Sequence, residues 1–194
     1  MRILLSALVL ILSIQSWTKA ADISDYEIEG ISIGDSLFKH MNINEIIDNG
    51  LYDSDSKFFE TSYQGKIKNF EYLTFHVKRN DPNYLIHAIR GVNTVETKND
   101  CLNDKKEIVK DLKKVFPNKK FIEGSQKHYF YTNSTQYISQ FFLGKQNTIE
   151  SDISRVECVI MDKKDIEKFS DHSMFNTLEL MIYTEEFAIW LENF

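Results

Sequence analysis

The sharpest chemical motif in this sequence surrounds Ser36. The string Gly34-Asp35-Ser36-Leu37 places a serine just after a glycine, where its hydroxyl could attack an ester carbonyl. Its own backbone amide would then help to hold the oxyanion. Such a serine also needs a base that takes its proton and a third group that orients the base. The sequence must therefore supply a histidine and an acid elsewhere.

These four residues resemble the signature that opens the GDSL, or SGNH, esterases and lipases. That family's later block puts an aspartate three residues before the histidine. The residues three before the five histidines here are Leu37, Leu73, Tyr84, Ser125 and Phe169. The Gly-x-Asn-Asp block is missing too, since Lys98-Asn99-Asp100 is the nearest string. An ester hydrolase is therefore the weakest alternative, and we expect a glycine turn into a helix that Asp35 or Ser36 caps.

His76 and His87 form a second constellation. A tight turn at Asp81-Pro82 would set His76 directly opposite His87, where two imidazoles could share a metal or form a pH-sensitive contact. The same register predicts two more facing pairs, Val77 with Ile86 and Phe75 with Ala88. Zinc usually requires three or four ligands, and no third is identifiable. A plain cross-strand pair is favoured, and we expect no metal and no cofactor.

Two cysteines, Cys101 and Cys158, allow a single intramolecular disulfide. Cys101 lies seven residues before Ile108, so both share the core-facing stripe of a helix. Cys158 alternates with Val156 and Ile160, which puts it on the apolar face of a strand. Both thiols should point into the layer between helix and sheet. In an oxidising compartment we expect them to be bonded; two separately buried free thiols are the alternative.

That compartment is indicated by the first twenty residues. Met1-Arg2 is a short basic start, Ile3 to Ile14 is an almost unbroken apolar run, and Thr18 with Ala20 suits cleavage between Ala20 and Ala21. The run is too short for a spanning helix, which needs about 20 apolar residues. We expect a cleaved signal peptide over residues 1–20, no stable membrane anchor afterwards, and a periplasmic or secreted protein.

Charge narrows the choice of partners for the mature chain. Loss of Arg2 and Lys19 with the signal removes two of 23 basic residues and none of 29 acidic ones, which leaves a formal charge of −8. A nucleic acid or an anionic membrane surface would call for a clustered basic face. We therefore expect neither, and retain an envelope protein or a small ligand as possible partners.

The order of elements predicts an α+β fold for residues 21–194, taken as a single domain. The apolar stripe of residues 100–116, which ends at Pro117, predicts one long helix. Thr184 should cap a short C-terminal helix. Alternation and β-branched residues predict strands over 57–63, 70–79, 84–95, 127–132, 137–143, 153–161 and 177–183. Strands grouped on both sides of one helix favour a mainly antiparallel sheet packed against that central helix.

Several strings together resemble a group of small exported proteins, of uncharacterised function, from AT-rich marine alphaproteobacteria. They are Ser16-Trp17-Thr18-Lys19-Ala20, Ile28 to Leu37, Ala88-Ile89-Arg90-Gly91, Cys101 at a helix start, Val115-Phe116-Pro117-Asn118 and Phe187-Ala188-Ile189-Trp190-Leu191. The resemblance implies a periplasmic or secreted location and supplies no activity. With no complete catalytic set visible, we expect a non-catalytic binding or interaction protein. An envelope-assembly accessory is the alternative by analogy of fold.

Overall fold

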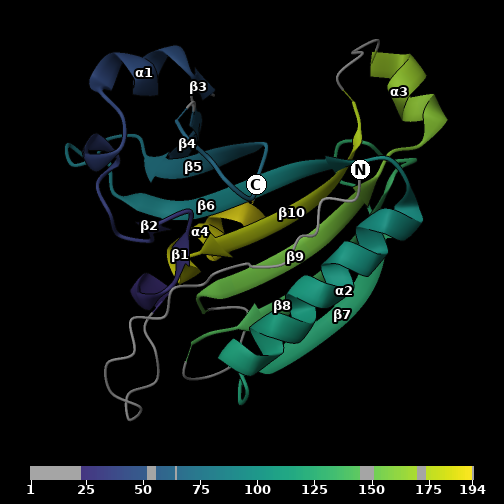
Figure 1. Cartoon of the computed structure of the whole chain (residues 1–194). Coiled ribbons are helices and arrows are strands. Elements are labelled where there is room, and N and C mark those ends of the chain that lie inside the picture. Colours follow the sequence, from purple (N-terminus) through teal and green to yellow (C-terminus); the bar gives the residue numbers. More distant parts are fainter. Residues whose placement is uncertain (1–22, 52–55, 64, 145–150, 170–173, 194) are drawn as a thin grey trace.

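The fold is built around a large antiparallel sheet (Figure 1). The computed structural model describes residues 23–51, 56–63, 65–144, 151–169 and 174–193. The expected signal peptide and its cleavage position at Ala20 and Ala21 lie outside these residues. Within them, the eight strands follow the order β3-β4-β5-β6-β10-β9-β8-β7. The fold is α+β, as the sequence predicts.

The elements of the sheet are β3 (Gly50–Leu51), β4 (Phe58–Tyr63), β5 (Tyr72–Lys78), β6 (Ile86–Val95), β7 (Lys120–Lys127), β8 (Thr135–Phe142), β9 (Ile153–Ile160) and β10 (Asn176–Tyr183). The helices are α1 (Ile43–Asp48), α2 (Lys98–Val115), α3 (Lys163–Phe169) and α4 (Glu185–Glu192), with 3-10 turns η1 (Ile23–Asp25) and η2 (Leu37–Lys39). A two-stranded ribbon, β1 (Glu27–Ile28) and β2 (Ile31–Ser32), precedes them.

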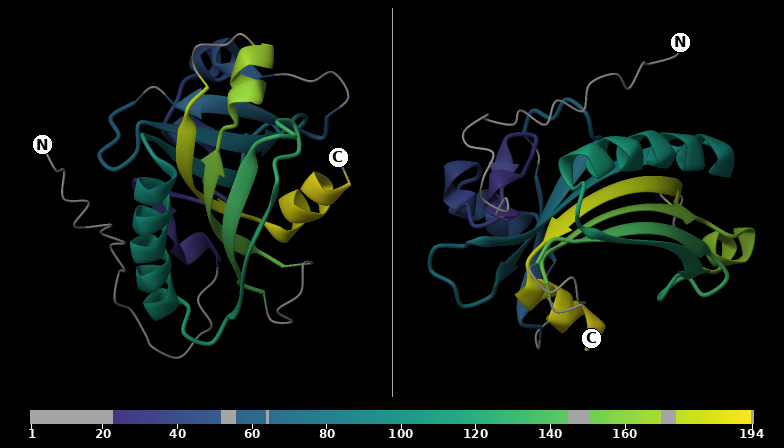
Figure 2. Two further views of the ribbon diagram at one scale, coloured as in Figure 1. Left: turned by 90° about the vertical axis from the view of Figure 1, so that its right-hand side faces the viewer. Right: turned by 90° about the horizontal axis from the view of Figure 1, so that it is seen from below.

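Helix α2 lies across one face of the sheet, and α4 lies on the other (Figure 2). Thr97 caps α2 by accepting a hydrogen bond from the Asp100 amide, and Pro117 follows its end. The apolar stripe of α2 is buried against β9 and β10, with Ile108 and Leu112 among its core residues. Each such aliphatic side chain contributes about 1.5–3 kcal/mol through burial. The stripe that predicts α2 from sequence is therefore also what docks it.

A second apolar cluster holds α4 to the opposite face. Its buried members are Phe58, Ala88, Phe142, Ile153, Tyr183, Phe187 and Ala188. Phe187 meets the Phe58 ring edge-on at a centroid distance of 5.2 Å. Thr184 caps the helix by accepting a hydrogen bond from the Phe187 amide. The C-terminal helix thus covers one end of this sheet face and leaves the rest to other groups.

The sequence-based hairpin register is correct at one end and wrong at the other. Val77 faces Ile86 as predicted, but His76 faces Ala88 and Phe75 faces Ile89. A bulge after His76 accounts for the change, because His87 is the extra residue on β6. His76 and His87 are therefore not a facing pair, and the metal or pH-sensor hypothesis built on that pair fails.

One strand is misplaced by the sequence analysis. The structure puts a strand at Lys120–Lys127, and residues 128–134 form a turn instead of the predicted strand over 127–132. β7 is an edge strand with side chains exposed on both faces, so it shows no apolar alternation. The aromatic residues after it have high β propensity, but they occupy a turn held by side-chain hydrogen bonds.

Cys101 and Cys158 join the start of α2 to β9. Their sulfur atoms are 2.08 Å apart and their Cα atoms 5.9 Å apart, as the predicted pairing requires. Both residues are fully buried between helix and sheet. The bond connects residues 57 apart in sequence, across the layer that α2 and the sheet share.

We expect loss of this bond to weaken the fold without changing it. The double variant Cys101→Ala/Cys158→Ala should unfold with a free energy lower by about 4 kcal/mol, because the open chain has more conformational entropy when unfolded. Urea denaturation of the oxidised protein, the reduced protein and the variant measures this. Equal midpoints for all three would show that the bond adds no stability.

Candidate functional site

Ser36 is placed as a helix cap. Its hydroxyl donates to the carbonyl oxygen of Asn83 at 2.6 Å and accepts from the Phe38 amide at 3.3 Å. Among the described residues, no hydrogen bond or ion pair links Ser36 to a histidine; the nearby His40 ring instead faces Asp35 at 3.8 Å. The geometry matches the expected cap at the start of η2.

The two hairpin histidines have separate environments. His76 lies 3.1 Å from a Glu60 carboxylate oxygen and packs on the Phe187 ring. His87 meets the Thr184 hydroxyl at 3.2 Å and the edge of Phe58. Burial lowers the pKa of His87 below its ordinary value. Within the described residues, no group of three or more His, Cys, Asp or Glu side chains is arranged to hold a metal ion.

A broad groove occupies the sheet face opposite α2. Its volume is about 1240 Å³, and its floor is formed by the outward-facing residues of β5, β6, β7, β8, β9 and β10. Because neighbouring residues of a strand point to opposite faces, this floor alternates in sequence with the core that packs on α2. The charged residues of this floor, Arg90, Arg155, Glu157 and Glu179, were not predicted from the sequence as functional.

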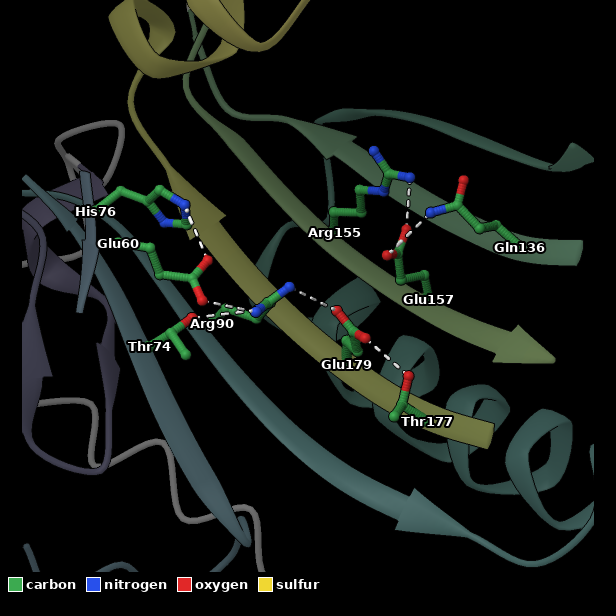
Figure 3. Close-up of polar contacts among 9 residues, drawn as sticks. All are labelled: Glu60, Thr74, His76, Arg90, Gln136, Arg155, Glu157, Thr177 and Glu179. Carbon is green, nitrogen blue, oxygen red and sulfur yellow. Dashed lines mark hydrogen bonds and ion pairs between the residues drawn. The ribbon is translucent and has the colours of Figure 1, made fainter. Parts of the chain in front are cut away.

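Charges on the floor form two adjacent cross-strand rows. In the first row, Arg90 on β6 and Arg155 on β9 both pair with Met181 on β10. In the second row, Glu179 on β10 pairs directly with Glu157 on β9. Figure 3 shows the two glutamates and the two arginines on this shared face. Two residues along a strand separate the rows, which is roughly 7 Å.

Arg90 is held mainly by Glu60 and Thr74. Its guanidinium donates to the Glu60 carboxylate at 3.1 Å and to the Thr74 hydroxyl at 3.2 Å (Figure 3). Burial alone would raise the pKa of Glu60, but the His76 hydrogen bond and the Arg90 charge outweigh it and hold that pKa at about 2. Glu60 therefore neutralises Arg90 over the whole neutral range.

Arg155 is paired in the same way with its strand neighbour Glu157. A guanidinium nitrogen lies 2.5 Å from Glu157 Oε2, and Gln136 donates to the other carboxylate oxygen at 3.4 Å. Burial raises the pKa of Glu157, which is only 4 % exposed, and the Glu179 charge raises it further, against the effect of Arg155. Arg155 Nε is buried with no hydrogen-bond partner among the described residues.

Glu179 is the least compensated charge of the floor. The Thr177 hydroxyl donates to it at 2.7 Å, while the nearest guanidinium nitrogen, on Arg90, is 3.7 Å away. That guanidinium is already bound to Glu60. The Glu179 residue is 8 % exposed and faces the Glu157 carboxylate across the strands. Like charges placed directly opposite are destabilising unless a proton or a cation intervenes.

Aromatic side chains form part of the groove wall. Tyr129 and Phe130, on the turn after β7, are 70 % and 64 % exposed, and Phe175, just before β10, is 55 % exposed. Large apolar groups gathered around a concave surface are typical of binding sites. We name this set, Tyr129, Phe130 and Phe175, the aromatic rim.

The turn that carries two members of the aromatic rim is tied down by polar bonds. His128 Nδ1 accepts from the Phe130 and Tyr131 amides at 3.1 and 3.2 Å. At its other end, the buried Asp165 of α3 accepts from the Asn133 amide at 3.0 Å, and from the Ser134 amide and hydroxyl at 2.8 and 2.6 Å. Burial alone would raise the pKa of Asp165, but these hydrogen bonds lower it.

A serine–lysine contact on the other face of the sheet is structural. Lys105 of α2 donates to the Ser139 hydroxyl at 2.6 Å and to the Glu123 carboxylate at 3.0 Å. Such a pair resembles a nucleophile with its base. Ser139 is completely buried in the layer beneath α2, however, so a substrate has no access to it. The Ser139 hydroxyl serves as a hydrogen-bond acceptor for the buried ammonium group of Lys105.

Comparison of the chain with protein-family models, with curated proteins and with solved structures gives no match. No helix in the described ranges is long and apolar enough to cross a membrane.

Replacement of Glu60 should destabilise the protein at neutral pH. The Glu60→Gln variant should lose about 3 kcal/mol of unfolding free energy at pH 7, because the carboxylate that neutralises Arg90 is gone. A lowered folded-state pKa stabilises above the unfolded value near 4.5 and loses that effect as pH falls through about 2. The difference from wild type should therefore shrink between these values in urea titrations. The exposed Glu167→Gln on α3 is the control, and a constant difference at all pH values would contradict the assignment.

Removal of the Asp165 carboxylate should loosen the turn after β7. In Asp165→Ala, the Asn133 amide loses its acceptor, so its hydrogen exchange should accelerate by at least about tenfold, whereas the Ser134 amide keeps the Tyr131 carbonyl at 2.8 Å. Hydrogen-exchange NMR measures this, with Glu167→Ala on the same helix as control. Unchanged protection of the Asn133 amide in Asp165→Ala would show that the turn is held by other contacts.

Proposed function

We propose that the protein is an exported, non-catalytic binding protein that holds a small amphipathic ligand in the groove opposite α2. The observation that carries the proposal is the combination of a concave surface of about 1240 Å³, a hydrogen-bonding charged floor and an exposed aromatic rim. Small-molecule sites are typically concave and largely apolar, with a few convergent polar groups.

The free-energy cost of burying charged residues on the floor supports a binding role for them. Buried charges in a strand cost free energy, and a core of aliphatic residues would serve stability at least as well. The chain nonetheless places Arg90, Arg155, Glu157 and Glu179 on its three central strands β6, β9 and β10. Arg155 Nε, without a partner among the described residues, is a donor that a ligand oxygen could satisfy.

Export is the second part of the proposal. The first twenty residues have the pattern of a cleavable signal peptide, and the Cys101–Cys158 bond suits an oxidising compartment such as the periplasm or the exterior. An envelope-assembly role lacks a comparable observation. An ester hydrolase centred on Ser36 lacks one too, because that hydroxyl donates to Asn83.

Gly124 offers a direct test of the groove. It lines the groove in β7, and a Cβ built there meets no atom within 4 Å, so a side chain can be added at this position without a clash at Cβ. Gly124→Trp should therefore weaken binding of the neutral fluorescent probe N-phenyl-1-naphthylamine by at least about tenfold. Fluorescence titration of the mature protein measures the affinity.

The matched control adds the same indole outside the groove. Lys106 is exposed on α2, on the opposite side of the sheet, so Lys106→Trp should bind the probe as wild type does. Circular dichroism and urea midpoints verify that both variants fold. Probe binding that is absent in wild type, or equally strong in Gly124→Trp, would refute the groove as the binding site.

A further inference from the structure

We propose that the groove's ligand carries an organic cation, an alkyl- or aryl-ammonium group, which binds at the Glu157–Glu179 row with its apolar part on the aromatic rim. This inference rests on the proposed binding function and names the class of ligand. Its first support is the distribution of charge on the floor, where the guanidinium groups of Arg90 and Arg155 contact Glu60 and Glu157 closely, at 3.1 and 2.5 Å, and Glu179 only at 3.7 Å.

The contacts on the floor identify which carboxylate is least well paired. Glu60 is bound by both His76 and Arg90, and Glu157 is bound by Arg155. Glu179 is left with one hydroxyl donor and a guanidinium nitrogen at 3.7 Å. A buried carboxylate without a full partner costs several kcal/mol unless something neutralises it. A ligand cation would supply that partner.

The arginines on the adjacent row do not prevent this. Arg90 and Arg155 each lie against a carboxylate, Glu60 at 3.1 Å and Glu157 at 2.5 Å, so their charges are largely cancelled within the floor. For the same reason a ligand carboxylate would gain little charge pairing from them, although Arg155 Nε remains a donor for an uncharged ligand oxygen. The least well paired charge on the floor is therefore the negative charge of Glu179.

Aromatic groups next to the glutamate row favour an organic cation. The row continues through Val92 to Tyr72, which pairs with Val92 on β5 and lines the groove. Ammonium groups are attracted to the faces of aromatic rings, and their alkyl parts bury on the aromatic rim. A bare metal ion would need more ligands than this row offers, since the described residues contain no cluster of three or more metal-binding side chains.

The test compares three probes that share one chain and differ in charge: octylamine, octanol and octanoate. Each competes with N-phenyl-1-naphthylamine for the mature protein, and calcium chloride is included as a purely ionic competitor. We expect octylamine to displace the probe at a concentration at least about tenfold lower than octanol, which corresponds to a charge-assisted hydrogen bond. Octanoate should be weaker than octanol.

Glu179→Gln is the decisive variant, because its amide oxygen can still accept from the Thr177 hydroxyl while the charge is lost. It should lose the preference for octylamine over octanol, measured as the ratio of the two concentrations that displace the probe. Glu167→Gln, exposed on α3, should keep that preference. A folded Glu179→Gln that still prefers octylamine would overturn the assignment of the row.

The remaining outcomes separate the two proposals. Probe binding with no preference for octylamine, or with a preference for octanoate, would refute the cationic ligand and leave the binding function standing. Displacement by calcium alone would likewise refute the organic cation. Failure of wild type to bind the neutral probe would overturn both proposals.

Discussion

The structure depends on the alternation of side chains along its β-strands. The central strands β6, β9 and β10 each direct one set of side chains toward α2 and the other set toward the groove. Helix α2 buries one face, where Cys158, Leu178 and Ile182 belong to the main core. The short helix α4 covers only one end of the other face, through Phe187 and its neighbours. The part of this face that α4 does not cover forms the floor of the groove.

Charge pairing is the means by which that open face is stabilised. Arg90 is paired with Glu60 on a nearby strand, and Arg155 is paired with Glu157 on its own strand. This arrangement keeps the face wettable and also fixes it, since removing one member of a buried pair leaves the other uncompensated. Glu179 departs from the pattern of mutual cancellation. The same residue thereby connects the stability of the floor with its proposed binding role.

The sequence predicts those helices and strands whose conformation follows from the pattern of apolar residues within the element itself. The stripe of Ile108 and Leu112 predicts α2, and alternation predicts β5 and β6, to within two residues at each end. The disulfide is predicted because Cys101 lies on the core-facing side of its helix and Cys158 lies on the apolar face of its strand. The edge strand β7 was missed because both of its faces are exposed, and the bulge at His87 changes a register that the turn alone cannot determine. The charged floor was missed because its residues lie on different strands, and the order of these strands in the sheet, β6-β10-β9, cannot be predicted from any single stretch of sequence. Charged residues at alternate positions of apolar strands, such as Arg155 and Glu157, were the available signal.

The exposed edge strand β7 has a consequence for how concentrated solutions of the protein behave. An uncovered edge is a template for pairing with a second copy. The strand reads Lys-Phe-Ile-Glu-Gly-Ser-Gln-Lys, so an antiparallel, centred pairing of two copies would set Lys120 opposite Lys127 at both ends. Four lysine charges would then meet in two like pairs, and Gly124 near the middle adds little to such a ladder. The arrangement of charge along this one strand thus disfavours self-association at the edge while leaving the groove beside it open.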